Sequence, residues 1–154
     1  MPRRAPVAVA LALAAGCAGP PMRVSPPTPD PAAAALCRAF VSALPRRLDG
    51  IDPGPTEPRS PLVRAYGGGR YVVRCGVPRP ADLRPTSQLF TVDGVDWFVQ
   101  EGPRRVRCTA VGRAAFVELS LPAGESAAGP LVDLAGPVRR TLPAVPVSAD
   151  RAAG

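Results

Sequence analysis

The chain has 154 residues, including 22 prolines and 15 glycines, and all 19 of its basic side chains are arginines. The 12 acidic residues leave a formal net charge of +7. Because histidine is absent, a Ser-His-Asp triad, a Cys-His pair and a His-ligated metal site are excluded. Because lysine is absent, a P-loop lysine, a Schiff base and a Ser-Lys dyad are excluded as well.

The basic charge is weak evidence for a nucleic-acid partner. Alanine, proline, glycine and arginine dominate the chain, which is typical of a GC-rich genome. A modest positive surface favours anionic lipid head groups or phosphate-bearing wall polymers. We therefore expect no nucleic-acid partner, and an anionic component of the cell envelope is one candidate ligand.

The N-terminus has the pattern of an export signal. Arg3 and Arg4 precede an apolar run over residues 5–15, which is too short to span a bilayer but fits a signal peptide. The following Ala14-Ala15-Gly16-Cys17 resembles a bacterial lipobox, in which the cysteine receives a diacylglycerol and the signal is removed just before it. We predict a signal peptide over 1–16 and lipidation at Cys17, which would place the protein on the outer face of the plasma membrane.

One feature of this motif leaves an alternative open. The lipobox prefers leucine three residues before the cysteine, where this chain has Ala14. An ordinary secretory signal, followed by release of the protein, is the alternative. In either case removal of Arg3 and Arg4 lowers the formal net charge from +7 to +5.

The segment that follows Cys17 is rich in proline. Such a segment favours an extended form that rises about 3.1 Å per residue, so a tether over 17–30 could hold the domain up to ~40 Å from the membrane. We predict one domain over 31–142 and a disordered tail over 143–154.

A helix and a long loop open the predicted domain. Asp30 is a good N-cap, and proline is favoured at the first helical position, which Pro31 would occupy. Apolar residues then follow helical spacing from Leu36 to Leu44, and Pro45 ends or kinks the helix. Residues 49–61 have the composition of a loop.

The centre of the domain has the alternation of β-strands, and its end has helical spacing. Asp93-Gly94 is a strong hairpin signal between two of the strands. A helix is expected over 130–142, with a break or a kink at Gly136-Pro137. The predicted strands cover 70–77, 87–92, 95–100, 105–111 and 115–121.

This element order predicts an α+β fold. Strands joined by short turns favour an antiparallel meander sheet, here of about four to five strands, because parallel strands need long crossover connections. An N-terminal and a C-terminal helix are expected to pack on one face of the sheet.

Several short strings of the domain resemble those of a known family. They include Leu36-Cys37-Arg38, Arg74-Cys75-Gly76-Val77-Pro78 and Val92-Asp93-Gly94-Val95-Asp96-Trp97. On these strings, over about residues 36–142, the chain resembles the actinobacterial domain-of-unknown-function family numbered 3515. The resemblance implies a small exported protein, often lipoprotein-like, and it supplies no catalytic residue, metal or cofactor.

Three cysteines remain after Cys17. In an exported protein, cysteines usually pair, and three thiols allow three pairings with one left over. The resemblance favours Cys37 with Cys75, because the family strings contain both and both lie on inward faces of the predicted helix and strand. Cys108 would then be a buried apolar thiol. A redox pair of Cys75 with Cys108 is the alternative, although it lacks Cys-x-x-Cys spacing.

Aromatic and arginine side chains suggest a binding surface. Trp97 and Phe98 must face opposite sides of their strand, so that one is in the core and the other can lie on the open sheet face. A ligand or partner surface could then combine Phe98 and Phe116 with Arg74 and Arg107. Glu118 lies on the face opposite Val117 and is expected to be solvated.

Three functions remain after these exclusions. The first is a membrane-anchored envelope lipoprotein that is not an enzyme and binds an envelope protein or a wall component. The second is a binding module for an anionic envelope ligand, with Arg70, Arg74, Arg105, Arg107 and Arg113 as candidate residues. The third is a small enzyme that uses carboxylates or thiols.

Overall fold

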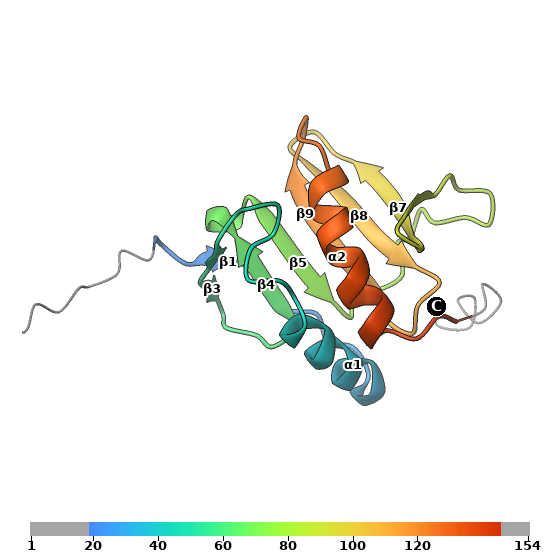
Figure 1. Ribbon diagram of the computed structural model, residues 1–154, viewed down its shortest axis with the longest axis horizontal. Coiled ribbons are helices and arrows are strands. Elements are labelled where there is room, and N and C mark those ends of the chain that lie inside the picture. The colour runs from blue at the N-terminus through green and yellow to red at the C-terminus, as the bar shows by residue number, and fades with distance from the viewer. Residues whose placement is uncertain (1–18, 146–154) are drawn as a thin grey trace, which may run out of the picture.

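A seven-stranded antiparallel sheet with two helices forms the domain (Figure 1). The computed structural model describes residues 19–145. The predicted signal peptide, Cys17 and the part of the predicted tail beyond residue 145 lie outside the described residues. The helices are α1 (Pro31–Ser42) and α2 (Ala128–Thr141). Figure 1 shows α2 across the front of the sheet and α1 near the lower ends of its strands.

The sheet has the strand order β2-β4-β5-β9-β8-β7-β6, and every neighbouring pair is antiparallel. The α+β class and the antiparallel sheet are confirmed, but the expected four to five strands were too few. A separate parallel pair joins β1 (Met22–Arg23) to β3 (Thr56–Glu57). The strands of the large sheet are β2 (Pro53–Gly54), β4 (Val63–Tyr66), β5 (Tyr71–Cys75), β6 (Phe90–Val92), β7 (Val95–Glu101), β8 (Arg105–Val111) and β9 (Val117–Pro122).

Strand β4 was not predicted because apolar residues cover both of its faces. Val63 and Ala65 pack under Val24, whereas Tyr66 belongs to the main core on the other side. A strand with apolar contacts on both faces lacks the polar–apolar alternation that reveals a half-buried strand. Strands β2 and β3 lie in the segment that was predicted to be a loop, and two-residue strands leave no periodic signal.

The main core lies between the helices and one face of the sheet, called here the helix face. Side chains at alternate positions of the strands point to this side, including Trp97, Cys108 and Leu119, all with 0% exposure. Helix α1 begins where predicted, because Asp30 Oδ1 accepts from the N–H groups of Ala32 and Ala33. Gly136-Pro137 does not break α2, since the helix continues through a buried Pro137.

The opposite face of the sheet is covered at both ends by chain segments. At one end Val24 packs on Val63 and Val72, and at the other end Val77 and Leu83 cover Phe98. The first segment belongs to the region predicted to be a tether. It is therefore docked on the domain from Met22 onward and does not extend away from it.

A disulfide bond between Cys37 and Cys75 joins α1 to β5, as the family strings implied. Both cysteines are fully buried in the main core. The described part of the chain includes no helix with the length and apolar character needed to cross a membrane.

Candidate functional site

A groove of about 620 Å³ lies between the C-terminal half of α1, the 53–61 segment and β4. Arg38, Arg59 and Arg64 line it, together with Ser42 and Ser60. We call it the arginine groove. Its volume falls within the range of about 300–1,000 Å³ that is usual for small-molecule sites.

Each of the three arginines comes from a different element. Arg38 is exposed on α1, on the side away from the main core. Arg59 is exposed in the segment after β3. Arg64 is half-buried on β4, and its Nη2 donates to the carbonyl oxygen of Val41 at 3.4 Å. This bond places a positive charge at the C-terminal end of α1, where the helix dipole is negative and favours cations.

No described carboxylate lines the arginine groove. The described ion pairs involve other arginines, namely Arg47 with Asp52, Arg70 with Glu125 and Arg74 with Glu118. Guanidinium groups bind phosphate and carboxylate through paired N–H donors, and serine hydroxyls can add single hydrogen bonds. The arginine groove therefore has the donor set of an anion-binding site.

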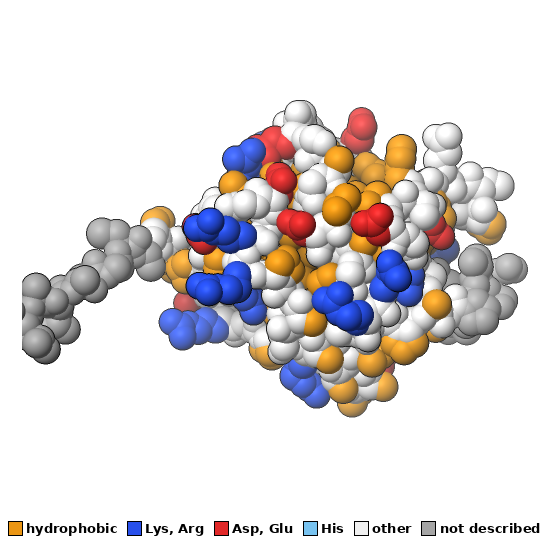
Figure 2. All heavy atoms as spheres, viewed as in Figure 1, with side chains coloured by type: hydrophobic (Ala, Val, Ile, Leu, Met, Phe, Trp, Pro, Cys, Tyr) orange, Lys and Arg blue, Asp and Glu red, His pale blue; other side chains and the backbone are white. Residues whose placement is uncertain are grey.

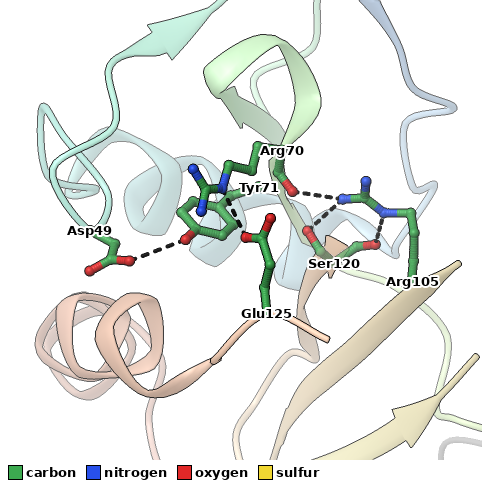
Figure 3. A network of polar contacts seen from close by, with 6 residues as sticks. All are labelled: Asp49, Arg70, Tyr71, Arg105, Ser120 and Glu125. Carbon is green, nitrogen blue, oxygen red and sulfur yellow. Dashed lines mark hydrogen bonds and ion pairs between the residues drawn. The ribbon is translucent and has the colours of Figure 1, made fainter. Parts of the chain in front are cut away.

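A polar network at one end of the sheet uses two of the arginines that the sequence suggested for binding (Figure 3). Arg70 Nε lies 2.8 Å from Glu125 Oε2, and the Arg70 guanidinium lies over the ring of Tyr71, 5.5 Å from its centre. The Tyr71 hydroxyl donates to Asp49 Oδ2 at 3.1 Å. Burial, followed by this hydrogen bond, raises the pKa of Tyr71.

Arg105 connects this network to the neighbouring strand. Its Nε donates to Ser120 Oγ at 2.7 Å, and its Nη2 donates to the carbonyl oxygens of Ser120 and Arg70 at 2.8 and 3.0 Å. Burial lowers the pKa of Arg105. The network ties β5, β8, β9 and the loop before α2 together. Because its donors and charges already have partners, it offers few free donors to a ligand.

The four residues suggested as a ligand or partner surface share one side of the sheet, but they form no open aromatic patch. Phe98 and Phe116 are each 9% exposed and pack under Val77 and Leu83. Arg74 is bound to Glu118, and Arg107 is exposed. Glu118 is 7% exposed, so the expectation that it would be solvated was wrong. It lies on β9 between two neighbouring strands, where Arg74 neutralises it.

The remaining thiol of residues 19–145 is poorly suited to nucleophilic or redox chemistry. Cys108 is fully buried, and burial together with nearby Glu118 raises its pKa to about 11. A thiol with this pKa carries almost no thiolate at neutral pH, and the thiolate is the reactive form. The alternative redox pair was wrong, because Cys75 is bonded to Cys37. Residues 19–145 contain no cluster of Cys, Asp and Glu that could hold a metal ion.

A second cavity of about 400 Å³ lies near the start of α1, between residues 76–79 and 113–116. Its two arginines are committed to backbone carbonyls. Arg79 Nη1 donates to Leu83 O at 2.9 Å, and Arg113 Nη2 donates to Gly94 O at 2.7 Å. Asp30 adds a negative charge to its wall. This cavity is therefore a weaker candidate for an anion.

The sequence reasoning missed the arginine groove. Arg38 lies off the apolar spacing of the predicted helix, and Arg59 lies in the predicted loop over 49–61. The grouping depends on β4, because the pairing of β4 with β2 and β5 brings Arg64 beside α1. Acidic residues are absent from Arg59 to Ala81, and this local excess of arginine was the only available signal.

The fold and the groove define a small disulfide-linked α+β domain with an arginine-lined surface. The chain belongs to the family described as protein of unknown function (DUF3515), whose model matches residues 5–147. This match confirms the resemblance drawn from the sequence strings. No curated protein and no solved structure matches the chain.

Proposed function

We propose that this protein is an exported, membrane-anchored component of the cell envelope that acts by binding an anionic ligand in the arginine groove. The observation that carries the proposal is a groove with three arginines and no described carboxylate in its lining. Arg47, Arg70 and Arg74 elsewhere in the fold are paired with carboxylates, whereas no groove arginine takes part in a described ion pair. The protein is proposed to be a binding module and not an enzyme.

Two features support the proposed location. Cys17 follows a signal-like N-terminus and small residues, as in a lipoprotein. The Cys37–Cys75 disulfide fits an oxidising compartment, because such bonds are rare in reducing ones. We propose the outer face of the plasma membrane, with the membrane itself and an anionic envelope component as the partners.

The ligand class can be tested with inorganic polyphosphate as the probe. The full chain should bind it, and Arg38→Gln/Arg59→Gln/Arg64→Gln should weaken binding by at least roughly tenfold, since a hydrogen bond to a charged group contributes about 1.5–3 kcal/mol. A matched control, Arg84→Gln/Arg104→Gln/Arg140→Gln, removes the same charge from exposed positions outside the groove. Equal losses in the two variants would contradict a specific site.

The anchor can be tested separately. Intact mass of the protein from the producing cell should show cleavage before Cys17 and the added lipid. Cys17→Ala should move the protein from the membrane fraction, because two acyl chains hold a protein stably and a bare chain lacks them. Unchanged membrane retention would contradict anchoring through Cys17.

A protein partner is a second candidate function, favoured by one observation on the edge strand β6. Phe90 on β6 is 58% exposed, and the preceding Leu89 is 41% exposed. Edge strands can pair with an extended segment of another protein. Crosslinked pull-down from envelope fractions should enrich a partner with the wild type and lose it with Phe90→Ser. Equal enrichment by both would remove this candidate.

A further inference from the structure

The N-terminal chain is bound to the wall of the arginine groove. Met22 N donates to Pro55 O at 2.9 Å, and Val24 N donates to Glu57 O at 3.1 Å, on either side of the β1–β3 pair. Pro55 and Thr56 also line the groove. Beneath the segment, Val24 packs on Val63 and Ala65. The chain that leads to Cys17 therefore meets the domain at the rim of the groove.

Side-chain packing fixes the docked segment further. The Met22 side chain lies so close to Gly69 that a Cβ there would approach Met22 Sδ to 2.6 Å. Pro29 lies equally tightly over Gly76, where a Cβ would approach Pro29 Cγ to 2.5 Å. Both glycines have positive φ angles, of 94° and 87°. The free length of the chain is thus set by the residues before Met22 and not by the whole segment up to Asp30.

This docking shortens the reach of the anchor. Five residue steps separate Cys17 from Met22. A fully extended chain spans at most about 3.6 Å per residue, so these steps reach ~18 Å at most. A tether free up to Asp30 would have allowed ~40 Å. If Cys17 is lipidated, the rim of the arginine groove must stay within a short distance of the lipid head groups.

Resting on the proposed anchor and groove, we propose that the ligand is the phosphate head group of an anionic phospholipid in the membrane that holds the anchor. Figure 2 shows basic side chains gathered on the side of the molecule where the described chain begins. The three groove arginines supply paired N–H donors for phosphate oxygens. Membrane surface charge adds about 1 kcal/mol of attraction for each arginine near it. The short anchor and the groove would then hold one face of the domain against the bilayer.

Partition onto vesicles tests this inference. The full chain with Cys17→Ser, which cannot be lipidated, is compared on phosphatidylcholine vesicles and on equimolar phosphatidylcholine–phosphatidylglycerol vesicles. The ratio of the two partition coefficients reports the preference for the anionic head group. The apolar N-terminal run contributes equally to all variants, so it does not affect a comparison between them.

The expected result is a strong preference for the anionic vesicles that depends on the groove. Arg38→Gln/Arg59→Gln/Arg64→Gln should lower the preference by roughly a hundredfold, since about 1 kcal/mol for each arginine corresponds to about fivefold each. Arg38→Gln/Arg59→Gln alters only the exposed pair and should lower it by roughly 25-fold. The double variant keeps the test valid if loss of Arg64 disturbs the fold.

Two results would overturn the inference. One is a wild type without preference for anionic vesicles, and the other is an equal loss in the control Arg84→Gln/Arg104→Gln/Arg140→Gln. Groove-dependent binding of polyphosphate without a vesicle preference would leave the proposed anionic ligand standing and refute the lipid. If the wild type showed neither groove-dependent binding of polyphosphate nor a vesicle preference, the proposed anionic ligand would be refuted as well.

Discussion

Arg74 and Glu118 form an ion pair across the neighbouring strands β5 and β9. Arg74 donates through Nε and Nη2 to the same carboxylate oxygen, Glu118 Oε1, at 3.1 and 2.7 Å. The Glu118 side chain is 9% exposed and that of Arg74 is 29% exposed. Arginine thus supplies the main compensation for a carboxylate that has lost most of its water.

Arg74→Met should destabilise the fold by about 2 kcal/mol, because it leaves the buried carboxylate without its partner. Glu118→Gln should cost about 1 kcal/mol, since the amide is neutral and the more exposed guanidinium can be hydrated. Urea unfolding at neutral pH measures both values. The double variant should be more stable than the sum of the single losses predicts, and simple additivity would show that the pair is not coupled.

Gly129→Ala should destabilise the protein although alanine is the better helix former. A Cβ at position 129 would overlap Asp49 Oδ1, and Asp49 is held in place by the Tyr71 hydroxyl and by Asp133, which accepts from its backbone N–H at 2.7 Å. We expect a net loss of about 1 kcal/mol or more, because overpacking outweighs the helix-propensity gain of ~1 kcal/mol.

Gly136→Ala is the matched control in the same helix. Its Cβ would meet the guanidinium group of Arg140, with Nη1 at 3.0 Å, and this is the end of a flexible, exposed side chain that can move away. We expect this variant to gain up to about 1 kcal/mol. Thermal or urea unfolding of both variants measures the change in stability that each substitution causes. If both were stabilised equally, Asp49 would not be fixed against α2.

Local patterns predicted most of the fold. The N-cap at Asp30, the spacing of apolar residues in both helices and the alternation in β8 are local signals, and the structure confirms these elements. The hairpin around Asp93 is confirmed as well, with Asp93 at φ 46°. Strand β4 was missed because its burial depends on contacts between segments that are distant in the sequence. The segment at Val24 covers one face of β4, and neighbouring residues in the sequence carry no information about that cover.

The candidate site was predicted less well than the fold, for the same reason. The partner of Arg74 is set by the register of β5 on β9, two strands that are joined through the rest of the sheet and not by a hairpin. Sequence alone could not show that Glu118 neutralises this arginine. Arg38, Arg59 and Arg64 meet through similarly non-local packing, so no spacing rule could have assembled the groove.

The disulfide predicts a defined thiol count. Denatured without reductant, the domain downstream of Cys17 should expose one alkylatable thiol, that of Cys108, and after reduction it should expose three. Cys37→Ala/Cys75→Ala should lower the stability by about 4 kcal/mol on the chain-entropy model for a 38-residue separation. Intact mass after alkylation provides the count. Three alkylated thiols without reduction would contradict the Cys37–Cys75 bond.

The buried thiol of Cys108 should make the fold sensitive to alkali. Burial raises its pKa from 9.0 to about 11, so the native state holds the thiol proton more tightly than the unfolded chain does. This contribution is fully present below about pH 9 and is lost as the pH rises to about 11. A difference of two pKa units corresponds to at most about 2.7 kcal/mol.

Urea unfolding at about pH 8 and about pH 10.5 measures this loss, with Cys108→Ala as the reference. Alanine leaves a cavity, so the variant should be less stable at the lower pH, and its disadvantage should shrink at the higher pH as the wild type alone loses the thiol contribution. Burial also raises the pKa values of Tyr66 and Tyr71. Both tyrosines are present in the wild type and in the variant, so their contributions to the pH dependence cancel in the comparison. A stability difference that stays constant with pH would show that Cys108 ionises in the native protein as it does in water.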